Sequence, residues 1–134
     1  MRYLLDTHIL LWWLRADDRL SKRHHAALEA EVTHQRQLAI SVFTLWEIAM
    51  LASRGRIAVQ GSLDHLIGDL ETNPALSVLP LSASIVLDSL RLGDTFPRDP
   101  ADQLIAATAR AHGLILVTVD ERIADAGVVP VLPC

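Results

Sequence analysis

The sequence is poor in the residues that build several common kinds of site. Its one cysteine, Cys134, excludes an internal disulfide and a metal site built from cysteines. Its 6 histidines include no H-x-x-x-H pair, which argues against a zinc site. A glycine-rich phosphate loop, a G-x-S-x-G elbow and a C-x-x-C motif are also missing. Acidic side chains are therefore the main candidates for chemistry.

Long apolar runs are absent as well. No uninterrupted stretch approaches the roughly 20 residues that cross a bilayer. Asp6 interrupts the apolar N-terminal stretch, so we expect neither a membrane association nor a signal peptide. The hydrophobic content of 51% excludes a disordered chain. For 134 residues we expect a single domain, residues 1–134, located in the cytoplasm.

Charge does not decide whether nucleic acid is a partner. The net charge of −4 argues against it, but a cluster of carboxylates at one site would account for that excess. Lys22 is the single lysine among 12 basic residues, and arginine suits bidentate contacts to phosphate.

Short apolar segments alternate with longer amphipathic ones along the chain. This alternation predicts an α/β fold in which a parallel sheet carries helices on both faces. The carboxyl ends of the strands then share one edge, where ligands bind in such folds. We expect strands at 3–5, 38–40, 76–79, 114–117 and 128–131, and helices at 9–14, 21–36, 44–53, 63–71, 82–92, 100–112 and 121–126.

Four acidic residues follow these strands or begin the next helix. Asp6 ends the first strand, and Glu47 lies in the first turn of the helix after the second. Asp102 lies in the first turn of a helix that begins near Pro100, and Asp120 follows the fourth strand. All four are therefore expected at the same edge of the sheet.

Each acid taken alone also fits a helix cap. Asp6 could cap the first helix, and Thr44 with Glu47 fits a capping box. Asp99 fits an N-cap followed by proline, and residues 118–121 (Thr-Val-Asp-Glu) fit a second capping box. Capping can explain each acid by itself, but it does not explain why all of them are expected at the same edge of the sheet.

Together the acids favour a metal site. Neighbouring carboxylates repel one another by several kcal/mol in a partly dry cleft unless a cation relieves them. Mg²⁺ prefers oxygen ligands and keeps waters on its open positions, and Mn²⁺ could replace it. Asp99 is a fifth candidate, either as an outer ligand or only as a cap, and His8 could touch substrate.

Four segments resemble the motifs of PIN-domain ribonucleases, specifically the VapC toxins of bacterial type II toxin–antitoxin modules. The segments are LLDTHILLWWL (4–14), SVFTLWEI (41–48), RDPADQLIAATA (98–109) and LVTVD (116–120). The resemblance covers nearly the whole chain in the expected order.

This resemblance implies a three-layer α/β/α sandwich with a central parallel sheet. It implies that Asp6, Glu47 and Asp102 bind the metal, while Asp120 matches a fourth acidic position whose role is less uniform. The implied activity is Mg²⁺-dependent endonucleolytic hydrolysis of RNA. Gln103 departs from an arginine often found after the third acid.

The resemblance also implies partners: a VapB-type antitoxin and a second copy of the chain in a homodimer. Two segments, 9–14 and 45–52, are apolar on nearly every side. Either they are buried on both sides within the monomer, or their outer faces meet another chain. Arg54, Arg56 and Arg98 flank acidic motifs and are candidates for RNA contacts.

Two other functions remain open. An aspartyl-nucleophile phosphatase using Asp6 would usually have a second aspartate where His8 stands, together with a lysine for the phosphate. A PIN-like module that binds RNA or a regulator without cleaving it would usually have lost some of the acids.

Overall fold

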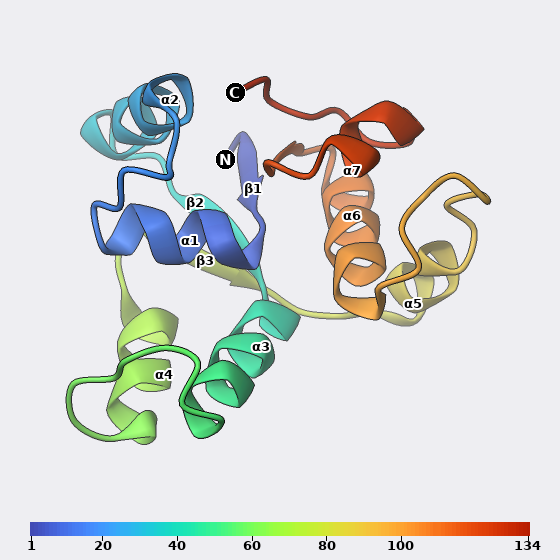
Figure 1. Cartoon of the computed structure of the whole chain (residues 1–134). Coiled ribbons are helices and arrows are strands. Elements are labelled where there is room, and N and C mark those ends of the chain that lie inside the picture. The colour runs from blue at the N-terminus through green and yellow to red at the C-terminus, as the bar shows by residue number, and fades with distance from the viewer.

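The computed structural model describes all 134 residues and has a four-stranded parallel sheet at its centre (Figure 1). Leu4 pairs with both Ala39 and Leu116, so the first strand lies in the middle of the sheet. The strands are β1 Tyr3–Leu5, β2 Leu38–Ser41, β3 Leu76–Leu79 and β4 Ile115–Val117, in the order β3-β2-β1-β4. The helices are α1 Thr7–Leu14, α2 Lys22–Thr33, α3 Val42–Ser53, α4 Leu63–Thr72, α5 Ala83–Ser89, α6 Pro100–His112 and α7 Glu121–Ala126.

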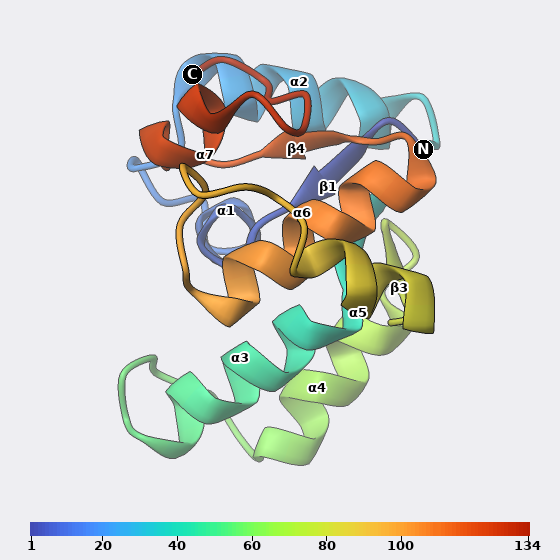
Figure 2. The same cartoon turned by 90° about the vertical axis from the view of Figure 1, so that its right-hand side faces the viewer.

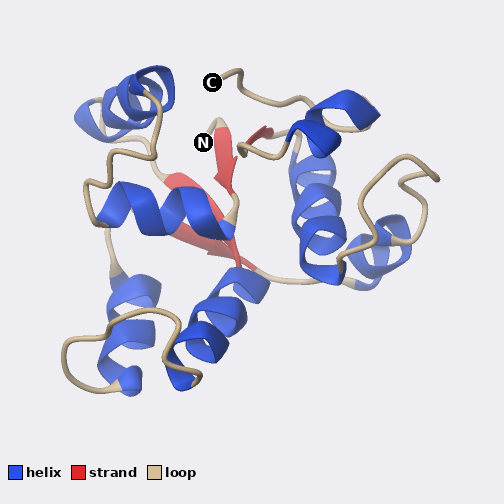
Figure 3. Ribbon diagram, in the orientation of Figure 1, coloured by secondary structure: helices blue, strands red, loops and turns tan.

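Successive residues of the strands point to opposite faces of the sheet and pack into two separate cores, one on each face. Leu5 packs into a core with residues of α1, α2, α3 and α4. Leu4 packs into the other core with residues of α6 and α7. Figure 2 looks onto this second group, with α5 and α6 in the foreground. The predicted α/β/α arrangement on a parallel sheet is therefore confirmed, and Figure 3 shows the strands enclosed by helices.

The order of the strands creates a switch point beside β1. The chain runs from β1 outward to β2 and β3, then returns through α5 and α6 to add β4 on the other side of β1. The segments after β1 and β4 therefore leave neighbouring strands in different directions, which opens a crevice at their carboxyl ends. The backbone N–H of Asp6 donates to the carbonyl of Val117 at 3.1 Å, which joins the two strand ends.

Three predicted elements are wrong in extent by three residues or more. The helix expected at 21–36 ends at Thr33. The strand expected at 128–131 is a single bridge between Leu116 and Val131. Pro130 has no N–H to donate, so the ladder cannot extend there. The helix expected at 82–92 ends at Ser89, and Leu90 and Arg91 continue it only as turns whose N–H groups bond three residues back.

The two apolar helices differ in how fully the chain covers them. In α1, Ile9, Leu10 and Leu11 are buried, and the indole N–H of Trp13 donates to Glu29 at 3.0 Å. In α3, by contrast, Trp46 leaves 54% of its surface exposed. Neither these helices nor any other in the structure is long and apolar enough to cross a membrane.

Candidate functional site

One cavity of about 610 Å³ lies where the segments after β1 and β4 meet the N-terminal parts of α1, α3 and α6. We call it the acidic cavity, because half of its lining residues are carboxylic acids. Its other lining residues include one cation, Arg122, and two aromatic side chains, His8 and Trp12. The acids are Asp6, Glu47, Asp99, Asp102, Asp120 and Glu121. The structure thus brings together all five acids selected from the sequence.

Asp6 is both a helix cap and part of the acidic cavity. Its Oδ1 accepts the backbone N–H of Ile9 at 3.0 Å, which caps α1. Its Oδ2 accepts the hydroxyl of Thr118 at 2.5 Å. Burial raises the pKa of Asp6, although both hydrogen bonds act in the opposite direction. Capping and a role in the cavity are therefore compatible in one side chain.

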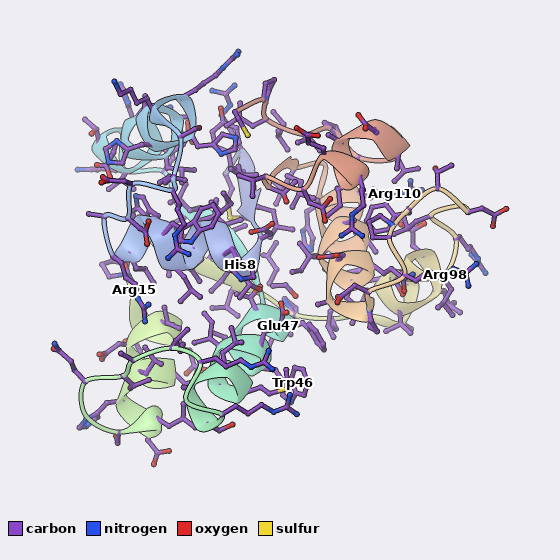
Figure 4. All side chains as sticks on the ribbon, in the orientation of Figure 1. His8, Arg15, Trp46, Glu47, Arg98 and Arg110 are labelled. Carbon is purple, nitrogen blue, oxygen red and sulfur yellow. The ribbon has the colours of Figure 1, made fainter.

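Glu47 is held by the first residue of α1 and not by its own helix. The capping box expected from Thr44 and Glu47 is wrong, because α3 begins two residues earlier with Ser41 as its N-cap. Glu47 therefore lies in the second turn, where its Oε1 accepts the hydroxyl of Thr7 at 2.5 Å. Burial raises the pKa of Glu47. Figure 4 shows Glu47 on α3 beside His8 of α1.

Asp99 and Asp102 share the start of α6 but differ in their hydrogen bonds. Asp99 is the N-cap and accepts the backbone N–H groups of Ala101 at 2.8 Å and Asp102 at 3.2 Å. The Asp102 carboxylate has no such donor. Burial, followed by repulsion from the neighbouring carboxylates, raises the pKa of Asp102 to about 7. Ionising Asp102 therefore carries a penalty that no hydrogen bond to its carboxylate offsets.

Asp120 is the acid whose charge is already balanced. It caps α7 in place of the predicted Thr118, and its Oδ1 accepts the backbone N–H of Arg122 at 2.9 Å. The Arg122 guanidinium also donates to Oδ1 at 3.1 Å and to Oδ2 at 2.8 Å. This ion pair lowers the pKa of Asp120. Arg122 was not predicted from the sequence to be a site residue. The only indication there is its position two residues after Asp120.

The donor set fits a hard divalent cation. Every acid that lines the cavity offers carboxylate oxygen, and no cysteine lines it. Burial and mutual repulsion raise the pKa of Asp102, so a cation would relieve a real penalty. No three of the side chains are arranged as a ready-made ligand set, so at least one carboxylate would need to turn before three of them could share one ion.

The arginines selected from the sequence do not line the acidic cavity. Arg54 and Arg56 follow the far end of α3, and Figure 4 places Arg98 beside α5. His8 does line the cavity, with its ring centroid 6.1 Å from that of Trp12. The cationic and aromatic side chains nearest the acids are therefore Arg122, His8 and Trp12.

A family model for the PIN domain matches residues 3–129. The chain belongs to the PIN-domain family. It is 34% identical to Ribonuclease VapC22 of Mycobacterium tuberculosis over 120 residues, which is 90% of this chain and 88% of that protein. The resemblance to VapC proteins inferred from the four motifs is confirmed by these two matches.

Solved structures share the fold. VapBC2 from Rickettsia felis, bound to a DNA fragment from its promoter, contains a chain that superposes with a TM-score of 0.69 at 20% identity, covering 98% of both chains. A toxin–antitoxin complex from Klebsiella pneumoniae contains one with a TM-score of 0.62 at 27% identity, covering 88% of this chain and 86% of that one. These PIN-domain neighbours have the same sheet and flanking helices over nearly their whole length.

Proposed function

We propose that this PIN-domain protein is a metal-dependent endoribonuclease that acts as the VapC-type toxin of a toxin–antitoxin pair. One observation carries the proposal: six carboxylates from four separate segments of the chain line a single cavity at the switch point of the sheet. The 34% identity to a protein named as a ribonuclease supports the same activity here.

Asp6, Glu47 and Asp102 would hold a Mg²⁺ ion, or Mn²⁺ in its place, with Asp120 and Asp99 at the edge of the site. Such an ion makes a bound water a stronger nucleophile and neutralises charge on the phosphoryl oxygens. The protein's own contribution is to orient the carboxylates. Threonine hydroxyls fix Asp6 and Glu47, so Asp102, or Asp120 once it leaves Arg122, accepts the proton of the attacking water.

Replacing Asp6 with asparagine tests the assignment. Asp6→Asn keeps the size of the side chain and the oxygen that caps α1, but it removes the charge. We expect RNA cleavage in Mg²⁺ to fall at least 100-fold, with the melting temperature little changed. Asp64→Asn, which removes an exposed acid of α4 outside the cavity, is the matched control. Cleavage by Asp6→Asn at the rate of the control would refute the proposed site.

We also propose an antitoxin partner and a homodimer. The partner is supported by structural neighbours that are toxin–antitoxin complexes, such as the one from Klebsiella pneumoniae. A homodimer is supported by large apolar side chains that the single chain leaves exposed, including Trp46 at 54% and Leu90 at 76%. Light scattering at micromolar concentration should give the mass of two chains, and a monomer under those conditions would contradict the dimer.

A further inference from the structure

Arg122 is the only arginine or lysine among the residues that line the acidic cavity. Six carboxylic acids line the same cavity. An RNA phosphate that enters it meets strong repulsion unless cations offset those charges. A single divalent ion balances only two of them. Arg122 therefore supplies a substantial part of the positive charge in the cavity, even when a divalent ion is bound there.

The pairing of Arg122 with Asp120 is set by local geometry. An identical arrangement occurs at Asp17 and Arg19, where the backbone N–H and the guanidinium of the arginine also donate to an aspartate two residues earlier. The two arginine side chains are similarly exposed, at 72% for Arg122 and 68% for Arg19. The bond to the aspartate therefore says nothing by itself about function.

The surroundings of the two pairs differ. Arg19 lies outside the acidic cavity, whereas Arg122 lines it and feels the charges of Asp99 and Asp102 as well as that of Asp120. Asp120 also lines the cavity, so its carboxylate can turn toward a cation held there. Because most of the Arg122 side chain is solvated, its guanidinium can leave Asp120 without unpacking the core.

We propose that Arg122 is a phosphate-binding residue of the acidic cavity, and that it and a divalent cation compete for Asp120. When Asp120 turns to the cation, the Arg122 guanidinium is released within the cavity and binds a phosphate of the RNA. A guanidinium suits this exchange, because its planar fork makes bidentate bonds to carboxylate and phosphate alike. The inference rests on the proposed function for its ligand, RNA.

The competition is tested without RNA, by calorimetric titration of the full chain with Mn²⁺. Arg122→Ala removes a positive charge beside the ion and frees Asp120, so we expect Mn²⁺ to bind about 5- to 10-fold more tightly. Arg19→Ala removes the same kind of pair and the same charge from a side chain that does not line the cavity and reaches it only through the ring of Trp12, so its Mn²⁺ affinity should match that of the wild type. An Arg122→Ala affinity equal to that of Arg19→Ala overturns the competition.

The phosphate contact is tested by RNA binding. A fluorescent single-stranded phosphorothioate oligoribonucleotide serves as the probe, because its linkages are hydrolysed more slowly, and gel electrophoresis after each titration verifies that it is intact. Anisotropy in Mn²⁺ over a salt series should show Arg122→Ala binding about 10-fold more weakly. The slope of log affinity against log salt should fall by about 1. Arg122→Lys, which keeps the charge, should recover the slope, and Arg19→Ala should behave as the wild type.

Tighter metal binding together with weaker RNA binding is a combination that damage to the fold would not produce. Equal midpoints of urea denaturation for the two alanine variants establish that both remain folded. Unchanged RNA affinity in Arg122→Ala overturns the phosphate contact. If the wild type binds the probe but does not cleave ordinary RNA, the proposed function fails while the role of Arg122 in binding is still decided.

Discussion

The Thr118 hydroxyl lies 2.5 Å from Oδ2 of Asp6 and donates a hydrogen bond to it, although 112 positions separate the two residues. The bond joins the segment after β4 to the segment after β1. Because the other oxygen of Asp6 caps α1, both oxygens of this carboxylate are held. Asp6 is thereby oriented before any ion or substrate binds.

Removing this hydroxyl should weaken metal binding. Thr118→Val keeps the shape of the side chain and frees Oδ2 of Asp6, so we expect about 10-fold lower affinity for Mn²⁺ in calorimetry, as is usual when a partner of a metal ligand is lost. Thr108→Val is the control, since Thr108 is also buried but donates to the Leu104 carbonyl within α6. Equal affinities in the two variants would show that Thr118 does not orient the site.

The stability of the chain without divalent cations should fall as pH rises. The pKa of Asp102 is about 7 in the folded chain against an ordinary value of 3.8, so the folded state favours the protonated carboxyl. That contribution is fully present below about pH 4 and is lost as pH rises through about 7. Allowing for solvent screening at a half-buried group, the loss should be about 1–2 kcal/mol.

Asp102→Asn separates this contribution from other titrations. In EDTA, urea denaturation should show the variant more stable than the wild type at pH 8, and nearly equal to it at pH 4. Asp64→Asn, at an exposed position of α4, should follow the wild-type profile. If the wild type were more stable than Asp102→Asn at pH 8, the predicted cost of ionising Asp102 would be contradicted.

Divalent cations should restore the folding stability that is lost as Asp102 ionises. A ligand that binds only the folded state at 100 times its Kd stabilises it by about 2.7 kcal/mol, which for a chain of this size raises the melting temperature by about 8 °C. We expect such a rise for the wild type in Mg²⁺ at pH 8, and little or none for Asp102→Asn. An equal rise in both would show that the ion binds elsewhere.

Much of the fold follows from local patterns that can be read along the chain. The four paired strands are short apolar segments. The boundaries of α6 are correct because Asp99, Pro100 and Gly113 determine them locally: a capping acid, a fixed first residue, and a C-terminal residue with φ of +64°. The convergence of the acids follows from parallel strands alone, since their carboxyl ends meet at one edge.

The contacts within the site depend on tertiary structure and could not be predicted in the same way. Thr44 and Glu47 have the spacing of a capping box, yet Ser41 caps the helix and Glu47 bonds to Thr7, 40 positions away. Arg122 looks like any exposed arginine in the sequence. Only the fold shows that its side chain borders the acids, whereas that of Arg54 does not.

The buried carboxylate of Glu31 should make stability depend on pH in the opposite direction from Asp102. Glu31 of α2 is only 1% exposed, and the Arg36 guanidinium donates to its two oxygens at 2.9 and 3.0 Å. This ion pair lowers the pKa of Glu31, so it stabilises the fold above the ordinary carboxyl range and does so less as pH falls. Arg2, 3.8 Å away, and the N-terminal ammonium are the remaining cations near it.

Arg36→Ala would leave the Glu31 charge buried with only Arg2 and the N-terminal ammonium to offset it. We expect a loss of about 2–3 kcal/mol at pH 7 in urea denaturation, because a buried ionised group without its hydrogen-bond donors carries an uncompensated desolvation cost. At pH 5 the loss should shrink, since the unpaired carboxyl takes up a proton. Adding Glu31→Gln should recover part of the stability, and Arg23→Ala, at an exposed position of α2, should cost little. A loss that is the same at both pH values would mean that Arg36 acts through packing and not through the charge of Glu31.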